Sequence, residues 1–226
     1  MLRFGLCAFA AAAFAAVALS PALDHLADRS FAWHMVQHML LIFAVPFFLL
    51  LAHPYRVLSR FASAPVQAAV VRFSRRFEAV AHPAVALAVF VATLWITHFS
   101  PLYELSLERE WVHIGEHALY LFAGLLFWAP VLAPPPLRPI PYPARLLYLL
   151  VALPQGALIA FAIAGSRRVL YAHYASNPAA LADQSNAAAV MWVAGGLILF
   201  TAFIGTFGAW AFRESRYAQP STGAIS

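Results

Sequence analysis

Long apolar segments without formal charge dominate the pattern of this chain. Six segments contain no Asp, Glu, Lys or Arg, and they cover residues 4–23, 30–55, 79–103, 117–137, 146–166 and 184–212. Each reaches the roughly 20 residues that an α-helix needs to cross the ~30 Å hydrocarbon core of a bilayer. None alternates apolar and polar residues as a lipid-facing barrel strand does. The pattern predicts an all-α, polytopic membrane helix bundle with six transmembrane helices.

The expected spans form a single integral membrane domain over residues 1–226. They run approximately over 2–22, 31–51, 83–100, 113–133, 146–165 and 187–211, with 213–226 expected as a loose cytoplasmic tail. The composition agrees, because 63% of the residues are hydrophobic and 10% are charged, whereas about a quarter are charged in soluble domains. A cleaved signal peptide is the alternative for the first span. We favour a retained helix, since Pro21 directly follows Ser20 where a small-x-small cleavage site is needed.

The arginines indicate the orientation of the chain. All 14 basic residues are Arg, and ten of them fall on the cytoplasmic side if both termini are cytoplasmic, against four on the outer side. Membrane proteins favour that distribution. We therefore expect both termini in the cytoplasm and a multi-pass protein of the bacterial inner membrane. Because this topology and the lipid bilayer account for the net charge of +5, we expect no nucleic-acid partner.

Most of the histidines gather at one expected depth. On this topology seven of the nine lie on the outer side. Two spans open with pairs four residues apart, His34 with His38 and His113 with His117, and His98 closes the span between them. Residues at i and i+4 share one face of a helix, so each pair can offer two imidazoles to one metal ion. Hydrogen bonding between helices is the alternative role for these pairs.

The remaining ligand types favour copper over zinc. Met35 and Met39 repeat the four-residue step beside the first histidine pair. Imidazole suits copper, zinc and iron, whereas thioethers select copper(I) in particular. The single cysteine, Cys7, cannot form a Cys-x-x-Cys metal clip. A metal site of histidine and methionine on the oxidising side of a membrane therefore points to copper.

Haem is the alternative cofactor for these histidines. A haem group between membrane helices needs axial histidines on different helices at matching depth, and His98 with His38 or His117 could provide them. Glu116 lies at membrane depth, where an ionisable side chain indicates function. It is expected to hold a histidine by a hydrogen bond or to gate the site.

Six short motifs follow one another in order between about residues 18 and 205. They are His34–Leu41, Thr97–Tyr103, Glu116-His117, Leu126–Val131, Asp183-Gln184 and Met191–Gly196. This ordered set resembles the polytopic, CtaG-type cytochrome c oxidase assembly proteins. The resemblance implies a role in maturing haem–copper oxidases, by handling copper for their metal centres.

Ligand chemistry and resemblance together predict a non-enzymatic assembly factor. It is expected to hold copper at the outer membrane face and to pass it to a haem–copper oxidase subunit or assembly intermediate. The expected metal ligands are His34, His38, His98, His113, His117, Met35 and Met39, with Glu116 and Asp183 orienting or gating the site. The alternatives are a haem-binding membrane electron carrier, a copper permease and a metal-free assembly scaffold.

Overall fold

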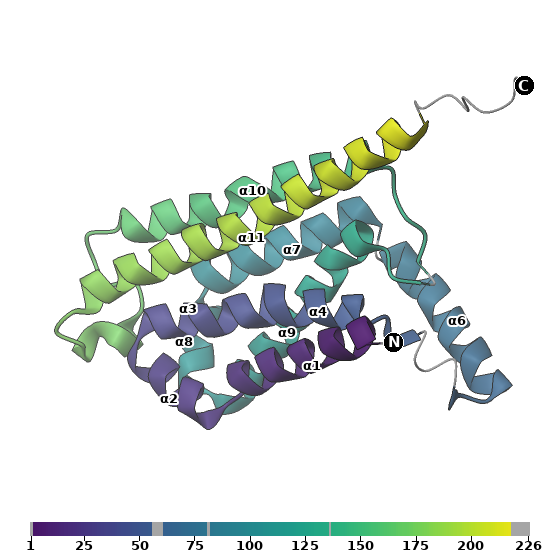
Figure 1. Ribbon diagram of the computed structural model, residues 1–226. Coiled ribbons are helices and arrows are strands. Elements are labelled where there is room, and N and C mark those ends of the chain that lie inside the picture. The colour runs from purple at the N-terminus through teal and green to yellow at the C-terminus, as the bar shows by residue number, and fades with distance from the viewer. Residues whose placement is uncertain (1, 56–60, 81, 136, 218–226) are drawn as a thin grey trace, which may run out of the picture.

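The regular secondary structure of the chain is helical wherever the computed structural model describes it, which is over residues 2–55, 61–80, 82–135 and 137–217. For residues 73–80 and 217 the description covers the backbone alone. Figure 1 shows an elongated bundle in which α10 (Tyr142–Ala164) and α11 (Ala180–Tyr217) run side by side. Helix α6 (Ala64–Val80) projects away from the bundle at one end. The predicted all-α class is confirmed.

Four helices in the described residues are long and apolar enough to cross a membrane alone. They are Phe31–Leu51, Glu110–Leu132 (α9), Tyr142–Ala164 (α10) and Ala180–Arg216 within α11. Two bent helix pairs raise the count to six if each pair is one span: Leu2–Ala18 (α1) with Pro21–Arg29 (α2), and Pro83–Phe99 (α7) with Pro101–Glu108 (α8). The chain is thus a multi-pass membrane protein with four to six candidate spans, and the predicted six is the upper figure.

A Ser-Pro dipeptide produces the bend in both pairs. Ser20 and Ser100 are extended, with ψ angles of 141° and 168°, because a following proline disfavours the helical conformation. Each serine hydroxyl then accepts a hydrogen bond from a backbone N–H of the next helix, at 3.2 Å in both cases. The helix axes turn by 47° between α1 and α2 and by 70° between α7 and α8.

Three long helices begin earlier than expected from the sequence. Helix α9 begins at Glu110 rather than 113, α10 at Tyr142 rather than 146, and α11 at Ala180 rather than 187. At its other end α11 continues to Tyr217, so the expectation of a loose tail from 213 is wrong for its first five residues. The reason is local, because residues 211–217 contain neither Gly nor Pro and Trp210 donates to Glu214 one turn later, at 3.2 Å. Residues 218–226 lie outside the described part.

The span Phe31–Leu51 is interrupted near its middle. It consists of α3 (Phe31–Met39), a π-helical turn η1 (Leu40–Ala44) and α4 (Val45–Leu51). Pro46 lacks the N–H that would bond to the carbonyl of Ile42 in a regular α-helix, and the ladder adjusts by a wider turn. The interruption before this proline therefore takes the form of a π-helical turn.

The same carbonyl lies at a close approach between two spans. An ideal Cβ built on Gly124 of α9 would lie 2.2 Å from the Ile42 carbonyl oxygen and 2.7 Å from the Pro46 ring. No side chain fits there, so glycine lets α9 lie against the π-helical turn. Around this crossing the largest buried side chains, among them Phe90, Phe127 and Trp128, fill the space between α7, α9 and η1.

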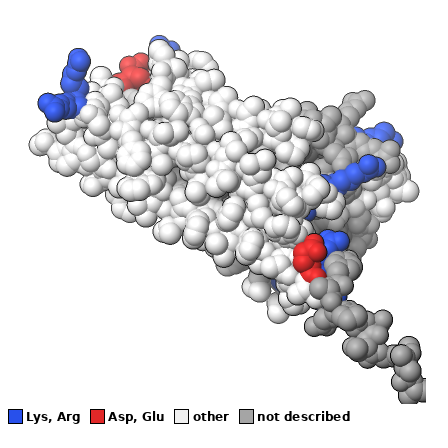
Figure 2. All heavy atoms as spheres, turned by 90° about the horizontal axis from the view of Figure 1, so that it is seen from above, with Lys and Arg blue, Asp and Glu red and all other residues white. Residues whose placement is uncertain are grey.

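Charged side chains lie at the ends of the bundle. Figure 2, which looks onto the face that carries α10 and α11, shows a broad belt without Lys, Arg, Asp or Glu between two ends that carry them. In Figure 1 the first residues of α1 and the last turn of α11 lie at the same end of the bundle. Helices α2 and α8 and the 3-10 helix η2 (Ala172–Ser176) lie at the other end. We call this second end the α2 end.

Candidate metal centre

Three buried histidines from two spans converge toward the α2 end. The group consists of His34 and His38 of α3 and His117 of α9, each offering one ring nitrogen. These three nitrogens lie within 4.8 Å of one another, close enough to share one metal ion. All three side chains are buried, and His38 is fully enclosed.

The four-residue spacing places each histidine pair on one helical face. The ring centroids are 4.3 Å apart for His34 and His38, and 4.1 Å apart for His113 and His117. His113 is only partly buried, and its ring lies 5.3 Å from that of His34. It therefore lies beside the three-histidine group, on the side of the α2 end.

Tyr174 of η2 fixes the protonation of His34. Its hydroxyl donates to the Ala27 carbonyl oxygen at 2.9 Å, and it lies 3.0 Å from His34 Nδ1. A carbonyl only accepts, so the tyrosine oxygen accepts in turn from the Nδ1–H of His34. The lone pair of His34 then resides on Nε2, which has no hydrogen-bond partner among the described residues. Metal-binding histidines are commonly oriented by such a partner.

This hydrogen-bond chain persists across neutral pH. Burial raises the pKa of the Tyr174 hydroxyl above its ordinary value, as it does for the neighbouring Tyr171. The Tyr174 hydroxyl therefore stays protonated and continues to donate to Ala27. His34 keeps its Nε2 available as a ligand as long as the imidazole remains neutral.

His38 has no hydrogen-bond partner on either ring nitrogen in the described structure. The ring packs against Tyr120, with centroids 4.2 Å apart. Its nearest charged neighbour is the Glu116 carboxylate, at 3.9 Å from Nε2, which is too long for a hydrogen bond. The oxygens of Glu116 are likewise buried without a hydrogen-bond partner in the described residues. Groups of this kind require an explanation, and a bound cation supplies one.

His98 faces a methionine rather than the histidine group. Its Nδ1 lies 2.7 Å from the Leu94 carbonyl oxygen, so this nitrogen carries the proton. The lone pair on Nε2 then points at Met35 Sδ, 3.4 Å away. His98 Nε2 and Met35 Sδ both carry lone pairs and face each other, so together they offer a soft pair of metal ligands. Met39 lies elsewhere, because its sulfur packs 3.9 Å from the Cβ position of Gly195 on α11.

Asp183 fixes the start of α3 at a distance from the histidine nitrogens. Its carboxylate accepts hydrogen bonds from the Ser30 hydroxyl at 2.7 Å and from the Phe31 N–H at 2.6 Å. A carboxylate at a helix N-terminus also interacts favourably with the helix dipole. Within the same helix Gln37 donates to the Ala18 carbonyl at 2.8 Å and to Asp24. Asp183 thus orients the helix that carries His34 and His38.

A cavity of about 210 Å³ connects His34 of the three-histidine group to the surface. It is lined by the buried His34, by the half-buried His113, and by Asp24 and Asp28. Asp28 has 65% of its side-chain surface exposed, so the cavity reaches the outside of the bundle. The acidic residues make this cavity favourable for a cation.

Sequence reasoning missed the tyrosines of the site. Tyr174 and Tyr120 contact His34 and His38 from distant segments of the chain. Tyr120 follows His117 by three residues and His113 by seven, so helical spacing could have placed it on the same face as these histidines. Tyr174 stands at no helical spacing from a candidate ligand, and we find no signal in the sequence that would have selected it.

Fold and site together define a multi-pass helical membrane protein with a buried histidine cluster that can hold a metal ion. The sequence model of the cytochrome c oxidase caa3 assembly factor family (Caa3_CtaG) matches residues 5–213. The chain belongs to this family, as the sequence motifs indicated. The family is described as one of assembly factors for cytochrome c oxidase caa3.

Curated relatives come from mycobacteria and carry no assigned function. Uncharacterized proteins of Mycobacterium bovis and Mycobacterium tuberculosis are each 27% identical to the chain over 205 residues. The alignments cover 84% of this chain and 31% of each relative. An uncharacterized protein of Mycobacterium leprae is 25% identical over 210 residues, with 83% and 31% covered. The chain therefore spans about a third of the length of these relatives. No solved structure matches it.

Proposed function

We propose that this chain binds copper at His34, His38 and His117 and passes it to a haem–copper oxidase subunit or assembly intermediate. The observation that carries the proposal is the set of three buried ring nitrogens within 4.8 Å of one another. Buried imidazoles with unpaired nitrogens are costly in a membrane interior unless they meet a partner. A shared metal ion meets all three at once.

The chemistry of the surrounding side chains supports copper. Imidazole accepts several metals, but the thioether of Met35 opposite His98 favours copper(I). Thiolate ligands, which would favour tight zinc binding, are lacking near the site, because Cys7 lies in the first half of α1. A ligand set without thiolate holds copper less tightly, and this suits a protein that must release its cargo.

The cavity lined by Asp24 and His113 offers a route for exchange. An ion attracted by the carboxylates would meet the half-buried His113 first and then the buried His34. Release would follow the reverse path. Met39 and Asp183 have no place on this route, and for them we propose packing and helix orientation.

We propose that this exchange takes place outside the cytoplasm. The arginine distribution favours cytoplasmic termini, and the metal centre lies at the opposite end of the bundle. We therefore propose a single integral domain in the inner membrane of a bacterium. Its metal centre would open to the periplasmic side, where the copper centres of oxidases are completed.

Metal content of the purified protein tests the proposal. The protein is purified in detergent from copper-replete cells, and copper, zinc and iron are quantified together with a visible spectrum. We expect about one copper per chain in the wild type, and its loss in the His34→Ala/His38→Ala double variant. His25→Ala is the matched control, because His25 is an exposed histidine of α2 outside the cluster.

The other functions give different results in the same experiment. Bound iron together with a Soret band would show that the protein binds haem and would refute the proposal of copper handling. Absence of metal would leave a metal-free scaffold. Uptake of copper into vesicles that contain the pure protein would indicate a permease. X-ray absorption that counts two or three nitrogen ligands, with or without sulfur, would then define the site in a copper-loaded sample.

A further inference from the structure

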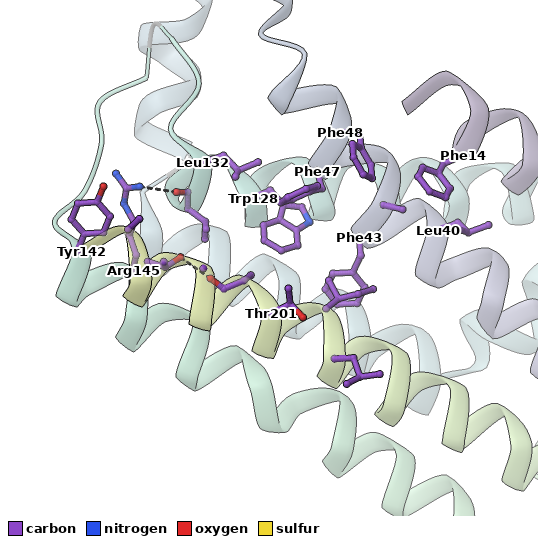
Figure 3. A pocket seen from close by; sticks show the side chains of 18 residues that line it. Phe14, Leu40, Phe43, Phe47, Phe48, Trp128, Leu132, Tyr142, Arg145 and Thr201 are labelled. Atoms are coloured by element: carbon purple, nitrogen blue, oxygen red, sulfur yellow. Dashed lines mark hydrogen bonds between the residues drawn. The ribbon is translucent and has the colours of Figure 1, made fainter. Parts of the chain in front are cut away.

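A second cavity lies away from the metal centre. It has a volume of about 760 Å³ and lies between α1, the η1–α4 half of the second span, the end of α9, and α10 and α11 (Figure 3). None of the histidines lines it. Sites for single small molecules have volumes of roughly 300–1,000 Å³. We call this space the aromatic groove.

The aromatic groove has mostly apolar walls, and its length is close to the thickness of the hydrocarbon layer of one membrane leaflet. Phe14, Phe43, Phe47 and Trp128 line it and are seen around it in Figure 3. Along α11 it extends from Leu197 to Ala209, which at ~1.5 Å per residue is about 18 Å. Half of a ~30 Å hydrocarbon core is about 15 Å. The dimensions fit the acyl chain of a lipid in one leaflet.

One end of the aromatic groove carries a single positive charge. Arg145 is the only formally charged residue among the residues described as lining it. Its Nε donates to the Ile140 carbonyl at 2.9 Å and its Nη1 to the Val131 carbonyl at 3.0 Å. The guanidinium lies 5.0 Å from the centre of the Tyr142 ring. These contacts involve Nε and Nη1 and hold the guanidinium at the end of the groove.

A guanidinium held in this way is suited to a phosphate group. Arginine presents a planar array of donors that matches phosphate geometry. No aspartate or glutamate lines the groove to neutralise Arg145, and Arg213 adds further positive charge nearby. Basic pockets between membrane helices bind anionic lipid headgroups on the same physical basis.

We propose that the aromatic groove binds one anionic phospholipid, with an acyl chain between the phenylalanines and its phosphate on Arg145. This site is separate from the metal centre and does not depend on the proposed function. Arg145 would select the anionic headgroup, and the groove would hold the chain. Such a lipid would fill the gap between α11 and the η1–α4 segment.

Two glycines of α11 allow the acyl-chain site to be tested. Gly205 lines the aromatic groove, Gly208 does not, and an added Cβ meets nothing within 4 Å at either position. Gly205→Leu therefore places a side chain in the groove without a clash at its Cβ. Gly208→Leu adds the same side chain outside the groove and is the control. For the headgroup, Arg145→Gln of α10 is compared with Arg216→Gln of α11, since Arg216 is exposed and does not line the groove.

The probe is palmitoyl-oleoyl phosphatidylglycerol, compared with the corresponding phosphatidylcholine, added to delipidated protein and counted by native mass spectrometry. We expect one phosphatidylglycerol retained per wild-type chain and on both control variants. Gly205→Leu should lose it. Arg145→Gln should retain it about fivefold less, the size expected for one basic contact with an anionic headgroup, and should no longer prefer it to phosphatidylcholine.

Several outcomes would overturn the proposal. Equal retention of the two lipids by the wild type, or the same retention by Arg145→Gln and Arg216→Gln, would show that no headgroup site exists. A quinone or a second polypeptide that co-purifies with the wild type and is lost in Gly205→Leu would assign the groove to that occupant. If Gly205→Leu does not fold, as judged by circular dichroism, Gly205→Ala and the arginine pair decide the question.

Discussion

Substitution of Gly124 by alanine tests the close approach between α9 and the π-helical turn η1. The added methyl group would lie 2.2 Å from the Ile42 carbonyl oxygen. A carbon and a carbonyl oxygen rest at no less than about 3.3 Å, so α9 and the π-helical turn must separate by roughly 1 Å. The obstacle is backbone, and no rotamer change relieves it.

The cost follows from two opposed terms. Overpacking of a closely packed contact costs about 1–3 kcal/mol, while replacing glycine by alanine inside a helix gains about 1 kcal/mol. Because the contact is with backbone, we expect the cost to be near its upper end and the net loss to be about 1–2 kcal/mol. Gly115→Ala is the matched control, since Gly115 lies on the same helix with nothing within 4 Å of its added Cβ. It should be neutral or stabilising by up to ~1 kcal/mol.

Thermal unfolding in detergent compares the two variants directly. A difference of ~1–3 kcal/mol in a chain of this size corresponds to a melting temperature roughly 2–12 °C lower for Gly124→Ala than for Gly115→Ala. Because Gly124 is seven residues from His117, the separation should also weaken metal retention in Gly124→Ala. Equal melting temperatures of the two variants would refute the close approach of these spans.

Two further substitutions test the hydrogen bond that orients His34 and the contact that fixes the start of α3. Tyr174→Phe removes the acceptor of the His34 Nδ1–H and should weaken metal retention by about 10–100-fold. The control is Tyr171→Phe, which loses the hydrogen bond from the Tyr171 hydroxyl to the His98 carbonyl at 2.9 Å and should change metal retention less. Metal titration compares the two variants. Asp183→Ala removes the cap of α3 and should cost about 1–2 kcal/mol in thermal unfolding, and Ser185→Ala, which loses a bond to its own helix at Leu181, is the control that should change little.

The sequence predicted the helices and the histidine pairs because both depend on local spacing. Charge-free segments of sufficient length must be helical in a membrane, since every backbone group needs an internal partner there. His34 and His38 share a face because they are four residues apart on one helix. The bent pairs were harder to predict, although Ser20-Pro21 and Ser100-Pro101 are local signals for a break.

Periodicity could not predict which helices face each other. From the sequence, His98 and His117 were therefore equally good candidates to join His34 and His38. In the structure His117 lies with these two histidines, and His98 lies against Met35. Helix packing is decided by contacts such as that of Gly124 with Ile42, between residues 82 positions apart in the sequence. Which of the candidate ligands bind metal stays a prediction.

Segments far apart in the sequence hold α3 in place around the metal centre. Asp183 bonds its first N–H, Gln37 ties its middle to the end of α1, and Tyr174 holds the ring of His34. These partners lie up to 153 positions apart in the chain. A helix held at three points has little freedom to turn, so the lone pair of His34 has a fixed direction before any ion arrives.

The metal centre and the aromatic groove are far enough apart to act independently. Arg145 bonds to the carbonyl of Val131, which lies 14 residues beyond His117 on α9, or about 21 Å along the helix. Sites separated by more than ~10 Å with no shared partner contribute additively. Variants of Arg145 and Gly205 therefore serve as folding controls for the histidine variants, and the histidine variants serve the same purpose for the groove.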